Sequence, residues 1–181
     1  MYQLQSHYQE AIRFATYKHV EKKQTVKGTR LPYVVHLSNV AMELFAAAIN
    51  TPGFDLDYAI QVALLHDTVE DTDTTFDEIK EKFGNEIAKG VLAMTKNEKL
   101  PKEMQIPDSL TRIKKLRKEV WAVKLADRLT NLQAPPKKWS KGKIRKYQED
   151  SKLIHHALRE GNEYLAKRLK EVIRDYDKYL S

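Results

Sequence analysis

Apolar residues recur at spacings of three and four along almost the whole sequence, and strict alternation of apolar and polar residues over the length of a strand is scarce. Ile12 and Ala15 show this spacing near the start, and Val40, Leu44 and Ala47 show it again. Side chains at these intervals share one face of an α-helix, whereas a half-buried strand alternates. The pattern therefore predicts an all-α fold.

Glycine-, proline- and lysine-rich stretches separate the helical segments, and none is long enough for a domain linker. We expect one domain over residues 1–181, because a chain of this length buries one sizeable core. The predicted breaks are the stretch before Tyr33, residues 50–53, Gly84, residues 96–107 and residues 134–142. The predicted helices cover residues 2–20, 34–49, 55–70, 75–83, 85–95, 108–118, 119–133, 141–160 and 162–179.

The absence of cysteine restricts the chemistry of any metal site. Disulfides and thiolate ligands are excluded, so a metal would be held by histidine, carboxylate and water. No apolar run approaches the roughly 20 residues that a membrane-spanning helix needs, and the first residues lack the apolar core of a signal peptide. We expect a soluble cytoplasmic protein with no membrane partner.

The net charge of +7 is unevenly distributed. Residues 1–95 contain 9 basic and 13 acidic side chains, whereas residues 96–181 contain 23 basic and 12 acidic ones. A basic half attracts polyanions such as nucleic acid or a phosphorylated nucleotide, but solvated lysine-rich helix faces are common. Because no nucleic-acid reader motif or basic groove with interleaved aromatic residues is recognised, we do not expect a nucleic-acid partner.

The stretch AIQVALLHDTVEDTD, residues 59–73, is the most informative part of the sequence. His66 falls on the apolar stripe of a predicted helix, where histidine is usually a core residue. Here Asp67 follows it directly, and Glu70 and Asp71 lie one helical turn further on. Burying these carboxylates together is costly unless a cation compensates them. The crowding therefore predicts a metal site.

Helix capping offers a simpler explanation for acidic residues in this region. Thr75 and the glutamate three residues later form a capping-box pattern at the start of the next predicted helix. That pattern accounts for Thr75 and Glu78, but not for His66, Asp67 or Glu70.

Two more residues are candidates for the same site. His36 opens a predicted helix after a loop, and Asp127 lies in a predicted helix among apolar neighbours. A buried aspartate needs a partner, and an ion pair with Arg128 or Lys124 is the alternative to a metal.

Together, His36, the His66–Asp67 doublet and Asp127 resemble the H…HD…D signature of the HD superfamily, in which these four residues bind one divalent cation. The motif HDTVED, with QTVKGTRLPYVVHL and VKLADRLTNL in matching order and spacing, is similar to the hydrolase domain of the RelA/SpoT-homologue family. The similarity covers roughly residues 8–135. It implies a compact, helical HD-domain fold in a small stand-alone hydrolase that lacks a synthetase domain.

The resemblance implies removal of the 3′-pyrophosphate from guanosine tetraphosphate or pentaphosphate by metal-activated water. Manganese is the expected cation, with zinc, iron or magnesium as alternatives, because the order of affinities alone does not choose among them. By resemblance Glu70 and Asp71 orient and deprotonate the attacking water, although the residues alone leave open a role in holding the ligands. The implied metal ligands are His36, His66, Asp67 and Asp127.

The expected substrate contacts are Lys27, Lys102, Lys124 and Asn131. Lys27 and Lys102 lie in the segments VKGT and KLPKE, which match positions that line the family's nucleotide pocket. Asn131 matches an asparagine that contacts sugar or phosphate in the family. The sequence departs from the family pattern at Val26, where many members have arginine. It also departs in NLQAPP, where an arginine and a threonine or another polar pair commonly follow the asparagine. Both departures affect the expected base and phosphate preferences.

We expect the other histidines and most aromatic residues to belong to the packing of the helices. We assign none of His7, His19, His155 and His156 to the metal. Tyr33 and Trp121 are candidates for stacking on a base, although residues of these types at helical spacing are more often part of a core.

Two alternative functions are open at this point. An HD phosphohydrolase acting on another phosphorylated nucleotide, such as an adenosine alarmone or an NADPH-like dinucleotide, would have the same catalytic centre. A binding module or antitoxin-like partner would have an intact metal site but no turnover.

Overall fold

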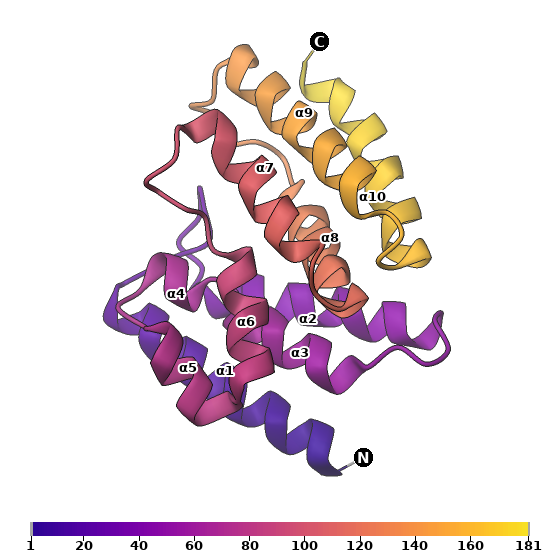
Figure 1. Cartoon of the computed structure of the whole chain (residues 1–181). Helices are drawn as coiled ribbons and strands as arrows, with labels where there is room; N and C mark the ends of the chain where they lie inside the picture. The colour runs from indigo at the N-terminus through magenta and orange to yellow at the C-terminus, as the bar shows by residue number, and fades with distance from the viewer. Residues whose placement is uncertain (1, 181) are drawn as a thin grey trace.

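The computed structural model describes residues 2–180, which form α-helices joined by short loops (Figure 1). Within this range the β structure is limited to one isolated bridge between Thr25 and Pro32. The all-α prediction is confirmed. The helices are α1 (Tyr2–Glu21), α2 (Val34–Ile49), α3 (Leu56–Leu65), α4 (Thr68–Asp71), α5 (Phe76–Phe83), α6 (Asn85–Met94), α7 (Lys102–Ile113), α8 (Lys118–Asn131), α9 (Lys141–Leu158), α10 (Glu163–Asp175) and the 3₁₀ helix η1 (Tyr176–Tyr179).

Helix α3 lies at the centre of the fold and packs against α1, α2, α6 and α8. All of its residues from Tyr58 to Leu65 are buried, as expected for a helix that is apolar on every side. In Figure 1, α1–α6 form the lower part of the molecule, and α7, α9 and α10 form the upper part. Helix α8 contacts both parts, through α2 and α3 on one side and α9 and α10 on the other.

The helix predicted over residues 55–70 is divided in the structure, because α3 ends before His66 and α4 starts after Asp67. The hydroxyl of Thr68 donates to the carbonyl of Leu65 over 2.7 Å. Such side-chain donors compete with the helical N–H groups for the last carbonyls and so favour termination. The interruption places the His66–Asp67 pair between two helices, at the end of the most buried one.

The loop predicted over residues 96–107 is shorter than expected, because α7 begins at Lys102 and continues through Pro107. Proline removes one helical hydrogen bond, which is why the sequence suggested a break. The burial of Leu110 and Ile113 and the neighbouring packing hold the helix together despite this cost. Tertiary packing therefore overrides the local signal.

The predicted cap at Thr75 is confirmed, since its side chain accepts a hydrogen bond from the backbone N–H of Glu78 over 3.2 Å. The Glu78 carboxylate instead pairs with Lys18 of α1 at 2.7 Å. One half of the capping box is therefore formed, and the other half is replaced by a contact that ties α5 to α1.

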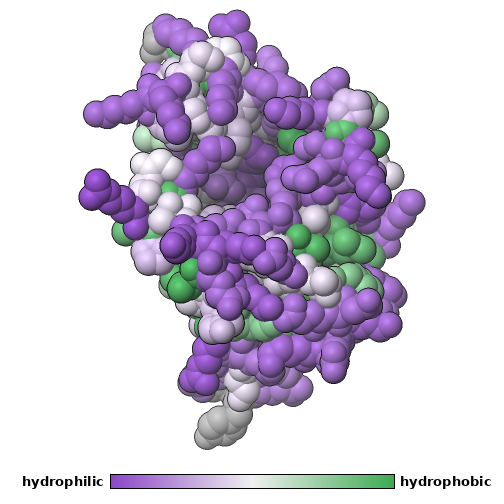
Figure 2. Space-filling view, turned by 90° about the vertical axis from the view of Figure 1, so that its left-hand side faces the viewer, coloured by the Kyte–Doolittle hydropathy of each residue, from purple (hydrophilic) through white to green (hydrophobic). Residues whose placement is uncertain are grey.

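Hydrophilic side chains cover much of the face shown in Figure 2, and a hollow opens at mid-height on this face. Among residues 2–180, no helix combines the length and apolar character needed to cross a membrane.

Candidate metal centre and nucleotide pocket

A cavity of about 630 Å³ lies between the two parts of the molecule, where α2, α4, α8 and α9 meet the loop after α1. Polar and charged side chains dominate its wall near α4, and aromatic and proline side chains line it near α9. Residues in the wall include Lys27, Tyr33, His36, Asp67, Glu70, Asp71, Lys96, Lys124, Asp127, Arg128, Asn131, Trp139 and Tyr147.

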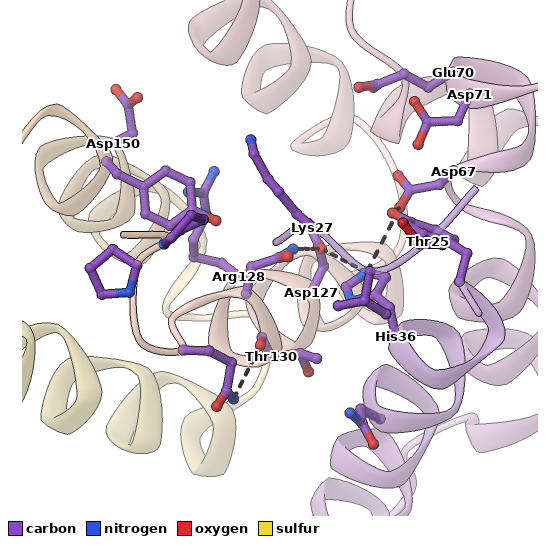
Figure 3. Close-up of a pocket in the computed structure, with 18 of the residues that line it drawn as sticks. Thr25, Lys27, His36, Asp67, Glu70, Asp71, Asp127, Arg128, Thr130 and Asp150 are labelled. Atoms are coloured by element: carbon purple, nitrogen blue, oxygen red, sulfur yellow. Dashed lines mark hydrogen bonds and ion pairs between the residues drawn. The ribbon is translucent and has the colours of Figure 1, made fainter. Parts of the chain in front are cut away.

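Three of the predicted metal ligands, His36, Asp67 and Asp127, line one end of this cavity (Figure 3). The buried His66 lies directly behind them, against Asp67 and Asp127. His36, His66 and Asp67 offer ligand atoms that all lie within 4.8 Å of one another. The Oδ1 atom of Asp127 lies 3.5 Å from Nε2 of His36 and 3.7 Å from Nε2 of His66. The fold thus brings together residues from α2, from the α3–α4 junction and from α8.

The two imidazoles present free ligand nitrogens to this cluster. Nε2 of His36 and Nε2 of His66 are buried and have no hydrogen-bond partner among the described residues. The Nδ1 atom of His66 lies 2.6 Å from the carbonyl of Ala63 and must donate to it, so in the neutral imidazole the lone pair is on Nε2. Two imidazole nitrogens facing two carboxylates are a suitable donor set for a divalent cation, and the backbone bond orients the ring as in known metal sites.

The charges within the cluster depend on one another. Burial alone would lower the pKa of His66, but Asp67 and Asp127 raise it well above its usual range. Burial alone would raise the pKa of both carboxyl groups. His66 instead holds the pKa of Asp67 below its usual value. Lys124, together with the two imidazoles, holds the pKa of Asp127 well below its usual value. The carboxylates therefore stay charged and attract a positive charge to the position between them and the imidazoles, where a proton or a metal ion fits.

Neighbouring side chains hold the two carboxylate ligands in place. The hydroxyl of Tyr33 donates to Asp67, and burial together with Asp67 raises the Tyr33 pKa, so the hydroxyl remains a donor. Asp127 accepts a hydrogen bond from the amide of Asn131 over 2.5 Å and pairs with Lys124 at 3.1 Å. Lys124 and Asn131, predicted as substrate contacts, do line the cavity, and both contact a metal ligand.

Glu70 and Asp71 extend the cluster along α4 into the cavity (Figure 3). Glu70 accepts hydrogen bonds from the backbone N–H of Lys96 over 2.9 Å and from the Lys96 ammonium. The amide of Gln24 donates to the backbone carbonyl of Asp71 over 2.9 Å, which fixes the end of α4. Burial and the charges of Asp67 and Glu70 raise the pKa of Asp71 to about 6.

The structure brings Lys27 to the cavity wall but leaves Lys102 outside it. Lys102 is exposed at the start of α7, and the lysine that reaches the carboxylates is Lys96. Burial opposes the charge of Lys96, yet Glu70, Asp67 and Asp127 raise its pKa above the usual value. The spacing of lysines in residues 96–102 offered no way to choose among them, because the choice depends on where α4 lies.

Aromatic residues divide between core and cavity. Trp121 donates from its indole N–H to the carbonyl of Leu116 over 3.1 Å and does not line the cavity, so it is a packing residue. His19 is buried, with its ring centroid 4.5 Å from that of Tyr33, and so supports the tyrosine that contacts Asp67. Trp139 and Tyr147 line the cavity but were not identified from the sequence, because neither follows a recognised motif.

The positions that depart from the family pattern lie in the cavity wall. Val26 lines the cavity, as do Ala134, Pro135 and Pro136 of the NLQAPP segment. The two stretches touch: a Cβ atom added to Gly28, whose φ is +81°, would lie 3.2 Å from Pro136. Substitutions in these segments therefore change the surface that faces a ligand.

Comparison with known proteins agrees with this geometry. The model of the HD domain family matches residues 11–162. A protein of Danio rerio named guanosine-3′,5′-bis(diphosphate) 3′-pyrophosphohydrolase MESH1 is 34% identical over 168 residues, covering 90% of each chain. The human protein of that name is 34% identical, covering 91% of this chain and 92% of its own.

A bacterial relative and a solved structure extend the comparison. A guanosine-3′,5′-bis(diphosphate) 3′-pyrophosphohydrolase of Aquifex aeolicus is 40% identical over 128 residues, 69% of this chain and 17% of its own length. The structure described as a metazoan ortholog of SpoT that hydrolyses ppGpp superposes with a TM-score of 0.80 at 28% identity and covers 97% of both chains. This chain therefore belongs to the HD domain family and, within it, to the family of MESH1-type guanosine-3′,5′-bis(diphosphate) 3′-pyrophosphohydrolases.

Proposed function

We propose that this chain, acting as a single HD-type domain, hydrolyses guanosine-3′,5′-bis(diphosphate) and related alarmones to release the 3′-pyrophosphate. The main support is the convergence of the orphaned Nε2 atoms of His36 and His66 with the carboxylates of Asp67 and Asp127. This donor set lies in a cavity that also contains Glu70 and several cationic side chains. The names and the extent of the MESH1 relatives support the same activity.

The four ligands His36, His66, Asp67 and Asp127 would hold one divalent cation. When bound there, such a cation supplies a Lewis acid that neutralises phosphate charge and makes water a better nucleophile. We propose manganese as the cation, because carboxylate and water ligands suit it and the family resemblance implies it. A nucleotide substrate and a chain without cysteine fit a cytoplasmic enzyme.

The carboxylates of α4 would handle the proton of the attacking water. Glu70 and Asp71 line the cavity one helical turn beyond the His66–Asp67 pair, where they can orient the water and accept its proton. The water oxygen bonds to the phosphorus attached to the ribose 3′-oxygen, and the bond between that phosphorus and the 3′-oxygen breaks. Pyrophosphate leaves, and the 3′-oxygen takes up a proton to become a hydroxyl.

The phosphates would be received by the ammonium groups at the cavity wall. Lys27, Lys124 and Lys96 line the cavity, so we expect Lys96, and not the exposed Lys102, to contact phosphate with the other two. Tyr33 and Asn131 hold the ligand carboxylates through hydrogen bonds, so their contribution is to keep the metal ligands oriented.

Incubation of the purified protein and manganese with guanosine-3′,5′-bis(diphosphate), its adenosine counterpart and NADPH tests the proposal. We expect the guanosine substrate to give the highest kcat/KM, with pyrophosphate as the product, and the Glu70→Gln variant to be nearly inactive. Turnover of NADPH alone, with release of phosphate, would assign the site to another nucleotide. If metal and nucleotide bind but no substrate turns over, the chain is a binding module.

A further inference from the structure

Arg128 carries a buried positive charge that the roles described above do not use. It follows the metal ligand Asp127 on α8, lines the same cavity and is only 8% exposed. Its Nε and Nη1 atoms are buried and have no hydrogen-bond partner among the described residues. Because the guanidinium stays protonated in proteins, this arrangement holds an uncompensated charge, which is destabilising unless an anion or a bound ligand offsets it.

The ring of Tyr147 holds this guanidinium at the cavity wall. The central carbon of the Arg128 guanidinium lies 4.5 Å from the centroid of the Tyr147 ring, a cation–π distance. Figure 3 shows Arg128 beside Asp127, between the metal-binding cluster and the part of the wall that carries Asp150. The contact fixes the position of the charge without neutralising it, since an aromatic ring carries no net charge.

Further cations gather on the same side of the cavity. The ammonium groups of Lys27 and Lys143 lie 5.1 Å and 4.8 Å from the centroid of the Trp139 ring. Burial lowers the pKa of Lys27, and the charges of Lys143 and other cations including Arg128 lower it further. Asp150, the carboxylate in this part of the wall, is already paired with Lys146 at 2.6 Å.

We propose that Arg128, together with Lys27 and Lys143, forms a second anion subsite that receives the 5′-diphosphate of the nucleotide. This inference rests on the proposed function, in which the metal-binding cluster takes the 3′-diphosphate. The substrate has a diphosphate at each end of its ribose, and Arg128 supplies a guanidinium that can bind phosphate in a bidentate manner. Many family members have an arginine in the loop after α1 where this chain has Val26. Arg128, on α8, would supply a guanidinium in its place.

A pair of substrates separates this subsite from the reaction centre. Guanosine-3′,5′-bis(diphosphate) carries the 5′-diphosphate, and guanosine 3′-diphosphate lacks it. In Arg128→Met we expect kcat/KM for the first substrate to fall by about tenfold or more, mainly through KM, while kcat/KM for the second stays within about twofold. Arg128→Lys should recover part of the loss, and Arg174→Met, which changes an exposed arginine on α10, should match the wild type.

The subsite fails if Arg128→Met lowers kcat/KM equally for both substrates, or leaves the preference for the 5′-diphosphate unchanged. Should Arg128→Met fold poorly in a thermal melt, Lys143→Ala replaces it, because Lys143 is exposed. That variant is expected to reduce the same preference. An unchanged preference in a folded Lys143→Ala protein would remove Lys143 from the subsite, and an unchanged preference in Lys27→Ala as well would overturn the proposal.

A binding measurement does not depend on turnover. Guanosine 5′-diphosphate is titrated into wild-type and Arg128→Met proteins in excess chelator and followed by calorimetry. We expect the variant to bind at least about tenfold more weakly. If the wild type hydrolyses no alarmone but binds guanosine 5′-diphosphate through Arg128, the proposed function fails and the subsite stands. Equal binding by both proteins, alongside normal hydrolysis, would reject the subsite alone.

Discussion

The backbone N–H of Lys96 donates to the carboxylate of Glu70 over 2.9 Å, and the ammonium of the same lysine contacts that carboxylate as well. This double contact joins α4 to the loop after α6. It holds Glu70 in the cavity wall, one helical turn beyond the residues that are suited to bind metal. The carboxylate that would activate water is thus positioned by a segment distant in sequence.

Glu70→Gln separates chemistry from metal binding. Glutamine retains the size of the side chain but lacks the basicity, so we expect turnover to fall by about 10²–10⁴ while the metal content stays that of the wild type. Metal analysis and kcat measured on the same preparation test this. Glu78→Gln, on α5 and paired with Lys18, is the matched control and should retain activity. Loss of metal from Glu70→Gln would instead make Glu70 a ligand.

Lys96→Ala and Lys102→Ala form a second pair of variants. Lys96 contacts Glu70 at the cavity, whereas Lys102 is exposed and outside it. A charged contact contributes roughly 1.5–3 kcal/mol, so we expect Lys96→Ala to lower kcat/KM by about tenfold or more. Lys102→Ala should leave kcat/KM within about twofold of the wild-type value. The opposite order would favour the assignment made from the sequence.

Removal of divalent cations is expected to abolish hydrolysis and lower the melting temperature. Cations bind the folded cluster and not the unfolded chain, so a concentration one hundred times the dissociation constant stabilises by about 2.7 kcal/mol. Asp127→Ala should remove the response of the melting temperature to manganese, because it eliminates one carboxylate ligand. Differential scanning calorimetry with and without manganese tests this. Full activity in excess chelator would contradict the metal assignment.

Asp71 gives a pH dependence with a defined sign. Its pKa is raised from 3.8 to about 6 in the folded protein, so the folded state binds this proton more tightly than the unfolded chain does. The tighter binding of this proton to Asp71 stabilises the folded state fully below pH 3.8, and this contribution is lost as the pH rises through 6. In excess chelator, Asp71→Asn should exceed the wild type in unfolding free energy by about 1–2 kcal/mol at pH 8, allowing for partial exposure.

Denaturant unfolding of Asp71→Asn and the wild type at several pH values measures this difference. It should shrink toward zero as the pH falls from 6 to about 4, since the wild-type carboxyl then becomes neutral like the amide. A difference that is the same at pH 8 and at pH 4.5 would mean that packing, and not charge, distinguishes the two proteins.

Local signals were sufficient for most helix positions and for the residues that we propose as metal ligands. The spacing of apolar residues predicts α2 over its exact range, and the capping pattern at Thr75 predicts the start of α5. Both signals act within one or two helical turns, so they can be read from a short stretch of sequence. The proposed ligands His36, His66, Asp67 and Asp127 were recognisable because each stands in a motif with characteristic neighbours.

Tertiary structure decided the features that depend on contacts between distant segments. The continuation of α7 through Pro107 and the choice of Lys96 over Lys102 both follow from packing. Arg128 appeared in the sequence only as an ion-pair partner for Asp127, but the fold buries it beside Tyr147 at the cavity. The sequence by itself therefore determined which residues are candidates to bind a metal, whereas only the fold decided which cations surround them, because a lysine or arginine is identical in local pattern whether it faces solvent or a cavity.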